Sequence, residues 1–62
     1  MNTEIFITKE EFEALSANRV LNKQAESYYV HEWFDSESYS VYKRTWFEDD
    51  EKFYSYWIEQ NS

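Results

Sequence analysis

Aromatic and β-branched residues are concentrated in two runs between residues 27 and 47, and this pattern predicts a β-hairpin. Two runs rich in Tyr, Trp, Phe and Val flank a polar segment at 35–38, which is typical of antiparallel strands joined by a four-residue loop. With Phe34 opposite Tyr39, the pleat divides the side chains between two faces. One face carries Tyr28, Val30, Glu32, Phe34, Tyr39, Val41, Lys43, Thr45 and Phe47, and the other carries Tyr29, His31, Trp33, Ser40, Tyr42, Arg44 and Trp46.

Both faces of this hairpin are aromatic, although a small antiparallel sheet usually covers one face and leaves the other in water. The face with Val30, Phe34, Val41 and Phe47 holds the hydrocarbon side chains, so we expect it to lie against the first helix. The other face combines indoles and phenols with His31 and Arg44, a composition that protein interfaces favour at their centres. Its cover is the C-terminal segment of the same chain, a second copy, or a target.

The first 18 residues predict a short strand followed by a helix. Residues 4–7 form an apolar run of strand length. Thr8 is a good N-cap, and Glu11, three residues later, completes a capping box. We expect the helix over 9–18, with two side chains in the core, Phe12 and Leu15.

Residues 19–26 have mixed polarity and weak periodicity. We interpret this segment as a connection that Val20 and Leu21 anchor to the core. Asn18 and Asn22 tolerate turn geometry there in place of the missing glycines.

The chain after residue 47 fits two structures. As a strand, residues 53–58 alternate poorly, with large apolar groups on both parities. As a helix, the same segment has one apolar stripe, and Asp49 is a suitable N-cap. We favour the helix, despite the strand preference of its many aromatic residues; its stripe is Phe53, Tyr54, Trp57 and Ile58.

These elements predict one small α+β domain spanning 1–62. Its centre is the β-hairpin, extended by the short N-terminal strand into a small antiparallel sheet, with one or two helices. The expected order is β-α-β-β-α. A chain this short draws only about 3–5 kcal/mol from its core, so association with a partner is a natural supplement.

Composition excludes several classes of function. The chain has no cysteine and a single histidine, so a Cys/His zinc site cannot form. It also lacks glycine and proline, which excludes phosphate-binding glycine loops and, we expect, the tight primed hairpin turns. We expect no cofactor and no catalysis. His31, Asp35 and Ser36 are the residue types of a hydrolase triad, but a strand entering its own loop gives them no reason to converge.

Thirteen acidic residues against six basic ones give a formal charge of −7. Such a chain repels nucleic acid and anionic lipid and is attracted to basic surfaces. No apolar run approaches the length of a membrane span, and the first residues lack the basic start of a secretion signal. The expected location is the cytoplasm.

Carboxylates gather in two places along the chain, and we predict that they contact a basic partner. The first group, Glu48, Asp49, Asp50 and Glu51, lacks the spacing and central glycine of a calcium loop, and its simplest role is to cap a helix. The second, Asp35 and Glu37, lies in the hairpin loop. Together they could occupy positions that a nucleic-acid-binding protein offers to phosphates.

The aromatic hairpin face supplies the remaining candidate contacts: Tyr29, Trp33, Tyr42, Arg44 and Trp46. Stacking of bases on these rings is the rival interpretation, but single-strand binders add a positive groove. This face offers only Arg44. We therefore do not expect direct nucleic-acid binding.

In bulk character the chain resembles the small inhibitor proteins that bacteriophages and mobile elements direct against host nucleases, defence complexes and nucleoid proteins, several of which imitate DNA. It is similarly short, acidic, aromatic-rich and free of cysteine, and no motif assigns a role to any single residue. The first hypothesis is therefore a non-enzymatic protein that occludes a basic nucleic-acid-handling or defence protein. The alternative is an assembly protein that forms a homodimer through its aromatic sheet face.

Overall fold

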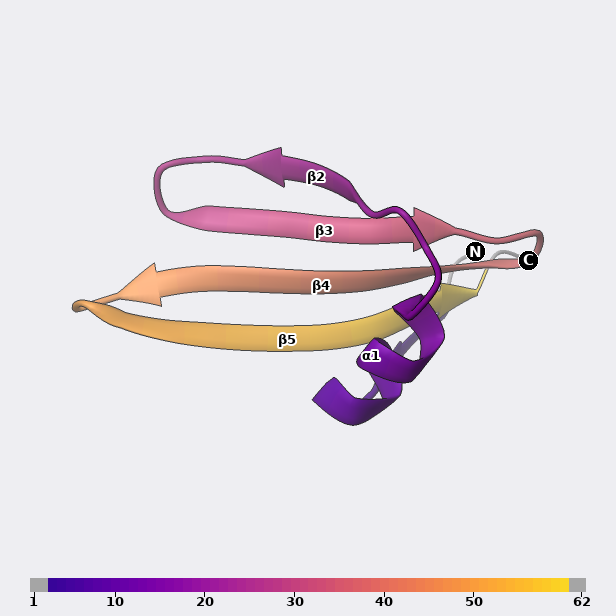
Figure 1. The fold of residues 1–62 in the computed structure, drawn as a ribbon. Coiled ribbons are helices and arrows are strands. Elements are labelled where there is room, and N and C mark those ends of the chain that lie inside the picture. The colour runs from indigo at the N-terminus through magenta and orange to yellow at the C-terminus, as the bar shows by residue number, and fades with distance from the viewer. Residues whose placement is uncertain (1–2, 61–62) are drawn as a thin grey trace.

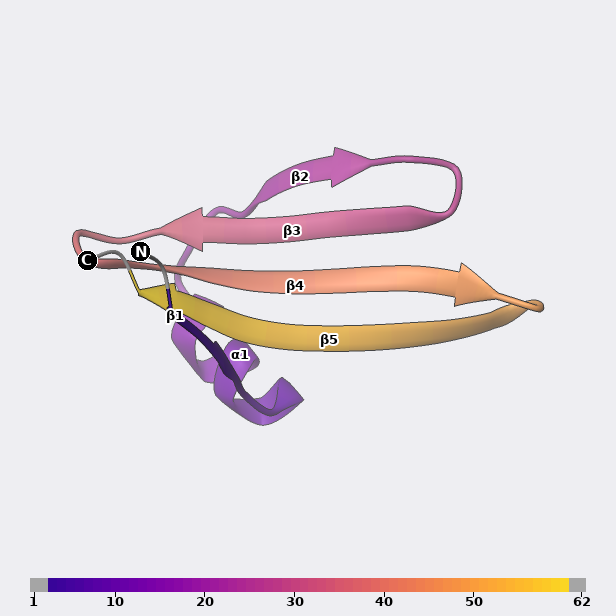
Figure 2. The same ribbon diagram turned by 180° about the vertical axis from the view of Figure 1, so that it is seen from behind.

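The computed structural model describes residues 3–60, which form an antiparallel sheet with one short helix (Figures 1 and 2). The predicted domain 1–62 includes residues 1–2 and 61–62, which lie outside the described residues. In chain order the elements are β1 (Thr3–Phe6), α1 (Lys9–Ser16), β2 (Asn22–Ala25), β3 (Tyr29–Asp35), β4 (Tyr39–Glu48) and β5 (Glu51–Gln60). The predicted small antiparallel sheet with a helix is confirmed, but the order is β-α-β-β-β-β.

The five strands lie in the order β1-β5-β4-β3-β2, and every neighbouring pair is antiparallel. Four consecutive strands form a meander, and β1 then pairs with β5 at the far edge. This pairing places the first and last strands of the described chain side by side, as Figure 2 shows.

Helix α1 begins where the sequence predicts. The Thr8 hydroxyl accepts a hydrogen bond from the Glu11 amide (3.1 Å), and the Glu11 carboxylate accepts one from the Thr8 amide (2.9 Å). This reciprocal capping box satisfies amides that the first turn would otherwise leave unpaired. The helix ends at Ser16, two residues before the predicted end.

The core is small and lies between α1 and one side of the sheet. Phe12, Phe34 and Val41 are buried, and the Phe12 ring lies 5.4 Å from the ring of Tyr56 on β5. We call this side the covered face. The expectation that it would lie against the first helix is confirmed. The prediction that Leu15 is buried is wrong, because it retains 37% of its exposure at the edge of this short helix.

The predicted C-terminal helix is wrong, because Glu51–Gln60 forms β5. Every residue of β5 has a partner on β4, from Glu51 opposite Glu48 to Gln60 opposite Tyr39. The apolar groups that looked like a helical stripe are divided between the two faces of a strand. A sheet with aromatic residues on both faces gives no clean alternation, which is why this segment did not show the period of a strand.

The segment after α1 also contains a strand that the sequence analysis missed. β2 pairs with β3 at the other edge of the sheet, and its four residues, NKQA, are all exposed and carry no apolar alternation. Leu21 packs against the core as expected, but Val20 does not anchor the connection, since it is 96% exposed.

The predicted hairpin and its two faces are confirmed, with a register that differs by two residues. Phe34 lies opposite Val41 rather than Tyr39, and Asp35 is the last residue of β3. The Ser36 amide donates to the Tyr39 carbonyl (2.8 Å), so the loop is tighter than predicted. A shift of two residues keeps each side chain on its face, whereas a shift of one would invert the faces.

The β4–β5 turn contradicts the expectation that a chain without glycine avoids primed turns. Asp49 and Asp50 have positive φ angles of 48° and 67°. Positive φ at both central residues is the pattern of a two-residue type I′ hairpin, which Asn and Gly usually provide. Asp49 therefore caps no helix and instead adopts a left-handed conformation that costs free energy in any residue with a Cβ atom.

Candidate functional site

The face of the sheet opposite α1, which we call the open face, carries a continuous row of aromatic side chains. Four cross-strand partners form it in order across β3, β4, β5 and β1: Trp33, Tyr42, Trp57 and Phe6. Tyr42 stacks on Trp57 with centroids 5.2 Å apart and planes at 10°, and Trp33 lies 6.4 Å from Tyr42. Phe6 lies 6.5 Å from Trp57 with its plane tilted by 56°, so the row is a continuous series of aromatic contacts that ends in a tilted ring.

A second aromatic row lies nearer the β4–β5 turn. Tyr29, Trp46 and Phe53 are cross-strand partners, and the rings of Trp46 and Phe53 stack at 5.8 Å. All three indoles of the chain are only partly buried, and each belongs to one of the two rows. No described segment covers them. The C-terminal segment extends this face as β5 instead of folding over it.

Arg44 lies between the two rows, opposite His31 on β3. Its guanidinium carbon is 5.3 Å from the Trp46 ring and 5.8 Å from the Trp57 ring. Cation–π contacts of this kind hold a guanidinium in place and leave its edge donors free.

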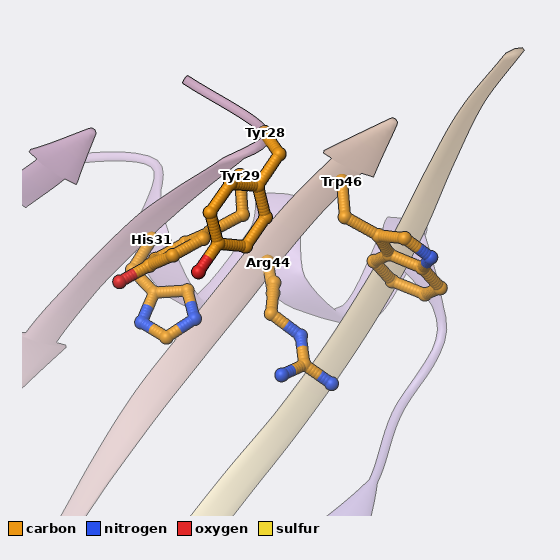
Figure 3. A pocket seen from close by; sticks show the side chains of 5 residues that line it. All are labelled: Tyr28, Tyr29, His31, Arg44 and Trp46. Carbon is orange, nitrogen blue, oxygen red and sulfur yellow. The ribbon is translucent and has the colours of Figure 1, made fainter. Parts of the chain in front are cut away.

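A hollow of about 470 Å³ opens at this point of the sheet. Figure 3 shows Arg44 between Trp46 on one side and His31, Tyr28 and Tyr29 on the other. Tyr28, just before β3, stacks edge-on against Tyr29 with ring centroids 4.9 Å apart, and Tyr29 lies 4.8 Å from His31. A smaller hollow of about 140 Å³ adjoins it, and Glu4 and Phe6 line that one together with Arg44.

Carboxylates occupy the open face at one end of the strands. Asp35, Glu59 and Glu4 lie in one row, with Ser40 between the first two. The Ser40 hydroxyl donates to Asp35 (2.6 Å), and the Trp57 indole N–H donates to Glu59 (3.0 Å). These bonds orient the carboxylates without neutralising them.

Partial burial raises the pKa of a phenol near these carboxylates. The pKa of Tyr42 lies above its usual value because of partial burial, the charges of Glu59 and Asp35 adding to the shift against a hydrogen bond with Ser40.

The β4–β5 turn places four more carboxylates at the opposite end of the strands. Glu48 and Glu51 are direct cross-strand partners, and Asp49 and Asp50 form the turn between them. Like charges opposite each other destabilise a strand pair. Backbone strain and charge repulsion therefore coincide at this turn, and none of its four side chains is buried.

The structure brings the predicted aromatic candidates together and separates the acidic ones. Tyr29, Trp33, Tyr42, Arg44 and Trp46 all lie on the open face. The acidic groups 35–37 and 48–51 lie at opposite ends of the ten-residue strand β4, which the usual rise of a strand makes about 30 Å long. They frame the aromatic rows instead of forming one cluster.

Strands β5 and β1 add residues to this face that the sequence pattern did not indicate. They are Glu4, Phe6, Phe53, Trp57 and Glu59. Treating 51–60 as a strand antiparallel to 39–48 would have placed Trp57 beside Tyr42. The strand preference of its aromatic residues was the available signal.

The residue types of a hydrolase triad, His31, Asp35 and Ser36, are not assembled as one. Asp35 accepts its hydrogen bond from Ser40, and the His31 ring lies 4.8 Å from the ring of Tyr29. Within residues 3–60 no three His, Cys, Asp or Glu side chains come close enough to hold a metal ion.

No helix in the described part of the chain has the length and apolar character needed to cross a membrane. Comparisons with protein-family models, with curated proteins and with solved structures found no match to this chain.

Proposed function

We propose that this protein is a non-enzymatic binding protein whose open face covers a basic, nucleic-acid-handling surface of another protein. The observation that carries the proposal is an uncovered aromatic sheet face with carboxylates at both ends of its strands. The aromatic rows supply contact area that can be desolvated, and the carboxylates steer the approach of a basic partner. A surface that accepts nucleic acid carries the Lys and Arg side chains that such carboxylates would bind.

The strained acidic turn supports a functional use of these charges. Asp49 and Asp50 hold left-handed conformations and lie between two carboxylates that repel each other. An Asn-Gly pair would form the same turn at lower free energy. A costly feature on an exposed turn, with no packing role there, is consistent with selection for partner binding.

A salt-dependent binding assay with matched variants tests the proposal. Immobilised protein should retain a nucleic-acid-binding protein from lysate at low salt, release it as salt rises, and lose it to added duplex DNA. Asp49→Asn/Asp50→Asn removes two charges from the turn, while Glu10→Gln/Glu13→Gln removes two from the exposed side of α1. Only the turn variant should weaken retention, and Asn at 49 and 50 should not unfold the protein, because Asn tolerates positive φ. Retention that is indifferent to salt, or equal in both variants, would contradict the proposal.

Self-association is the second candidate function, and the same uncovered aromatic rows favour it. Two open faces packed with their strands aligned would bring carboxylate ends together in a protein of charge −7. A dimer formed this way should therefore strengthen with added salt, whereas binding to a basic partner should weaken. Sedimentation velocity at low and high salt separates the two functions.

A further inference from the structure

The open face carries a negative-positive-negative charge pattern along β4. At one end of β4, Ser40 is paired with Asp35 and Glu59, which are negative. At the middle of β4, Arg44 is paired with His31. At the other end, Glu48 is paired with Glu51 beside the acidic turn. Arg44 is four residues from Ser40 and four from Glu48, about 13 Å in each direction at the usual rise of a strand. The face is thus not uniformly acidic, because a cation lies midway between two acidic ends.

Arg44 is presented outward instead of being used within the fold. It is exposed, and its neighbours at 5.3 and 5.8 Å are indole rings. These cation–π contacts restrain the guanidinium, and the fork of its N–H donors favours a carboxylate bound in bidentate fashion. Glu4 lines the smaller hollow together with Arg44, so its carboxylate competes with a partner carboxylate for the Arg44 donors.

The larger hollow has room and donors for an acidic side chain. Its 470 Å³ are lined by Arg44 and His31, by two tyrosines and by Trp46, as seen in Figure 3. When a partner covers the hollow, its aromatic walls reduce the access of water and strengthen a charge-assisted hydrogen bond to Arg44. A carboxylate that enters here meets the only arginine of this face.

We infer that the partner surface carries a carboxylate at the centre of its basic area, and that Arg44 binds this carboxylate in the hollow while the two acidic ends of the sheet bind the flanking basic groups. The inference rests on the proposed function and restricts the class of protein that can be the partner. Basic side chains around central carboxylates are the arrangement of metal-dependent nucleic-acid sites, where the acids hold the cation and the basic groups hold the phosphates. Arg44 would then occupy the position of the metal cation in such a site. The two acidic ends of the sheet would occupy the positions of the phosphates.

Two synthetic peptides test this charge pattern directly. The first, Lys-Lys-Thr-Ser-Thr-Asp-Thr-Ser-Thr-Lys-Lys, places lysines four residues to either side of an aspartate, and the second replaces the aspartate with asparagine. Binding of each peptide is measured at low salt by titration calorimetry and by amide shifts. We expect the aspartate peptide to bind wild-type protein about three- to tenfold more tightly, despite its lower positive charge.

Two neighbouring substitutions provide the matched comparison. Arg44→Gln should remove the preference for aspartate, whereas Lys43→Gln should preserve it. Lys43 carries the same charge one position away and lies over Tyr54 at 5.5 Å on the covered face. In wild-type protein, the amide shifts that distinguish the two peptides should centre on His31 and Arg44.

The possible outcomes separate failure of the inference about Arg44 from failure of the proposed function. Equal, salt-sensitive binding of both peptides would overturn the role of Arg44 and leave the proposed function intact. If neither peptide binds at low salt, the proposed function fails with it. A preference for aspartate that survives Arg44→Gln would also overturn the inference.

Discussion

Both faces of this sheet carry aromatic residues, but the faces differ in what these side chains contact. On the covered face, Phe34 and Val41 pack under Phe12 of α1 and are almost inaccessible to water. On the open face, Trp33, Tyr42 and Trp57 contact one another and remain partly accessible. The first face stabilises the fold through burial, and the second provides a preformed surface.

The reach of the helix causes this difference. The eight residues of α1 cover only one end of the covered face. Beyond the helix, Phe47 and Tyr54 on the same face retain 41% and 49% of their exposure. Cations lie over both rings, Lys52 over Phe47 at 5.8 Å and Lys43 over Tyr54 at 5.5 Å. Long basic side chains thus shield the rings of the covered face that lie beyond α1. On the open face, among the described residues, Arg44 is the one cation in contact with the aromatic rows.

The largest expected effect comes from removing the centre of the covered face. Phe12→Ala should lower the free energy of unfolding by about 3–5 kcal/mol, which is comparable with the whole stability expected of so small a domain. Urea unfolding followed by circular dichroism measures it. Leu15→Ala on the same helix should cost below about 1 kcal/mol, since Leu15 is already 37% exposed. Equal losses from the two variants would refute the assigned core.

The open face should show the opposite balance between stability and binding. Trp46→Thr keeps a strand-forming residue and should cost about 1 kcal/mol of stability, but it should reduce retention of the partner about tenfold or more. Phe47→Thr, one residue away on the covered face, is the matched control and should leave retention unchanged. The proposed division between the faces would be wrong if the two variants lost binding equally.

The acidic turn should gain stability when its charges and strain are removed. Asp49→Asn/Asp50→Gly supplies the residues that positive φ prefers and relieves repulsion with Glu48 and Glu51. We expect an increase of about 1 kcal/mol in the free energy of unfolding, together with weaker partner binding. Glu37→Gln in the other hairpin loop should change stability little. A loss of stability in the turn variant would show that these aspartates serve the fold.

The smallest effect should appear at alkaline pH, with one tyrosine on each face. Burial raises the pKa of Tyr42 on the open face, and burial also raises the pKa of Tyr56 beneath α1. A raised phenol pKa means that the folded state holds the proton more tightly than the unfolded chain. The stability is therefore full below the ordinary value of about 10 and is lost as pH rises through the folded pKa.

Urea unfolding between pH 9 and pH 11 checks this dependence. Tyr42→Phe and Tyr56→Phe should each reduce the alkaline loss of stability, and Tyr28→Phe, at an exposed position, serves as the control. An unchanged pH profile in both variants would contradict the raised pKa values.

The amino-acid sequence by itself determined the capping box at Thr8, the central hairpin and the division of its side chains between two faces. These features depend on residues close together in the chain and on the strict period of a strand. The same local signals could not identify β5, because a segment with aromatic residues on both parities is compatible with a helix until a partner strand is known. β2 was hidden for the same reason, since its exposed polar residues become a strand only by pairing with β3.

Only the tertiary structure decided how the site is assembled. Pairing of β1 and β5 with the hairpin extended the aromatic rows to Trp57 and Phe6, and the antiparallel turn at Asp49–Asp50 sent its carboxylates to the end of the sheet opposite Asp35. Cross-strand register brings together residues that are distant in the chain, and no short-range pattern contains that information. The aromatic and acidic residues were visible in the sequence, but their arrangement around Arg44 was not.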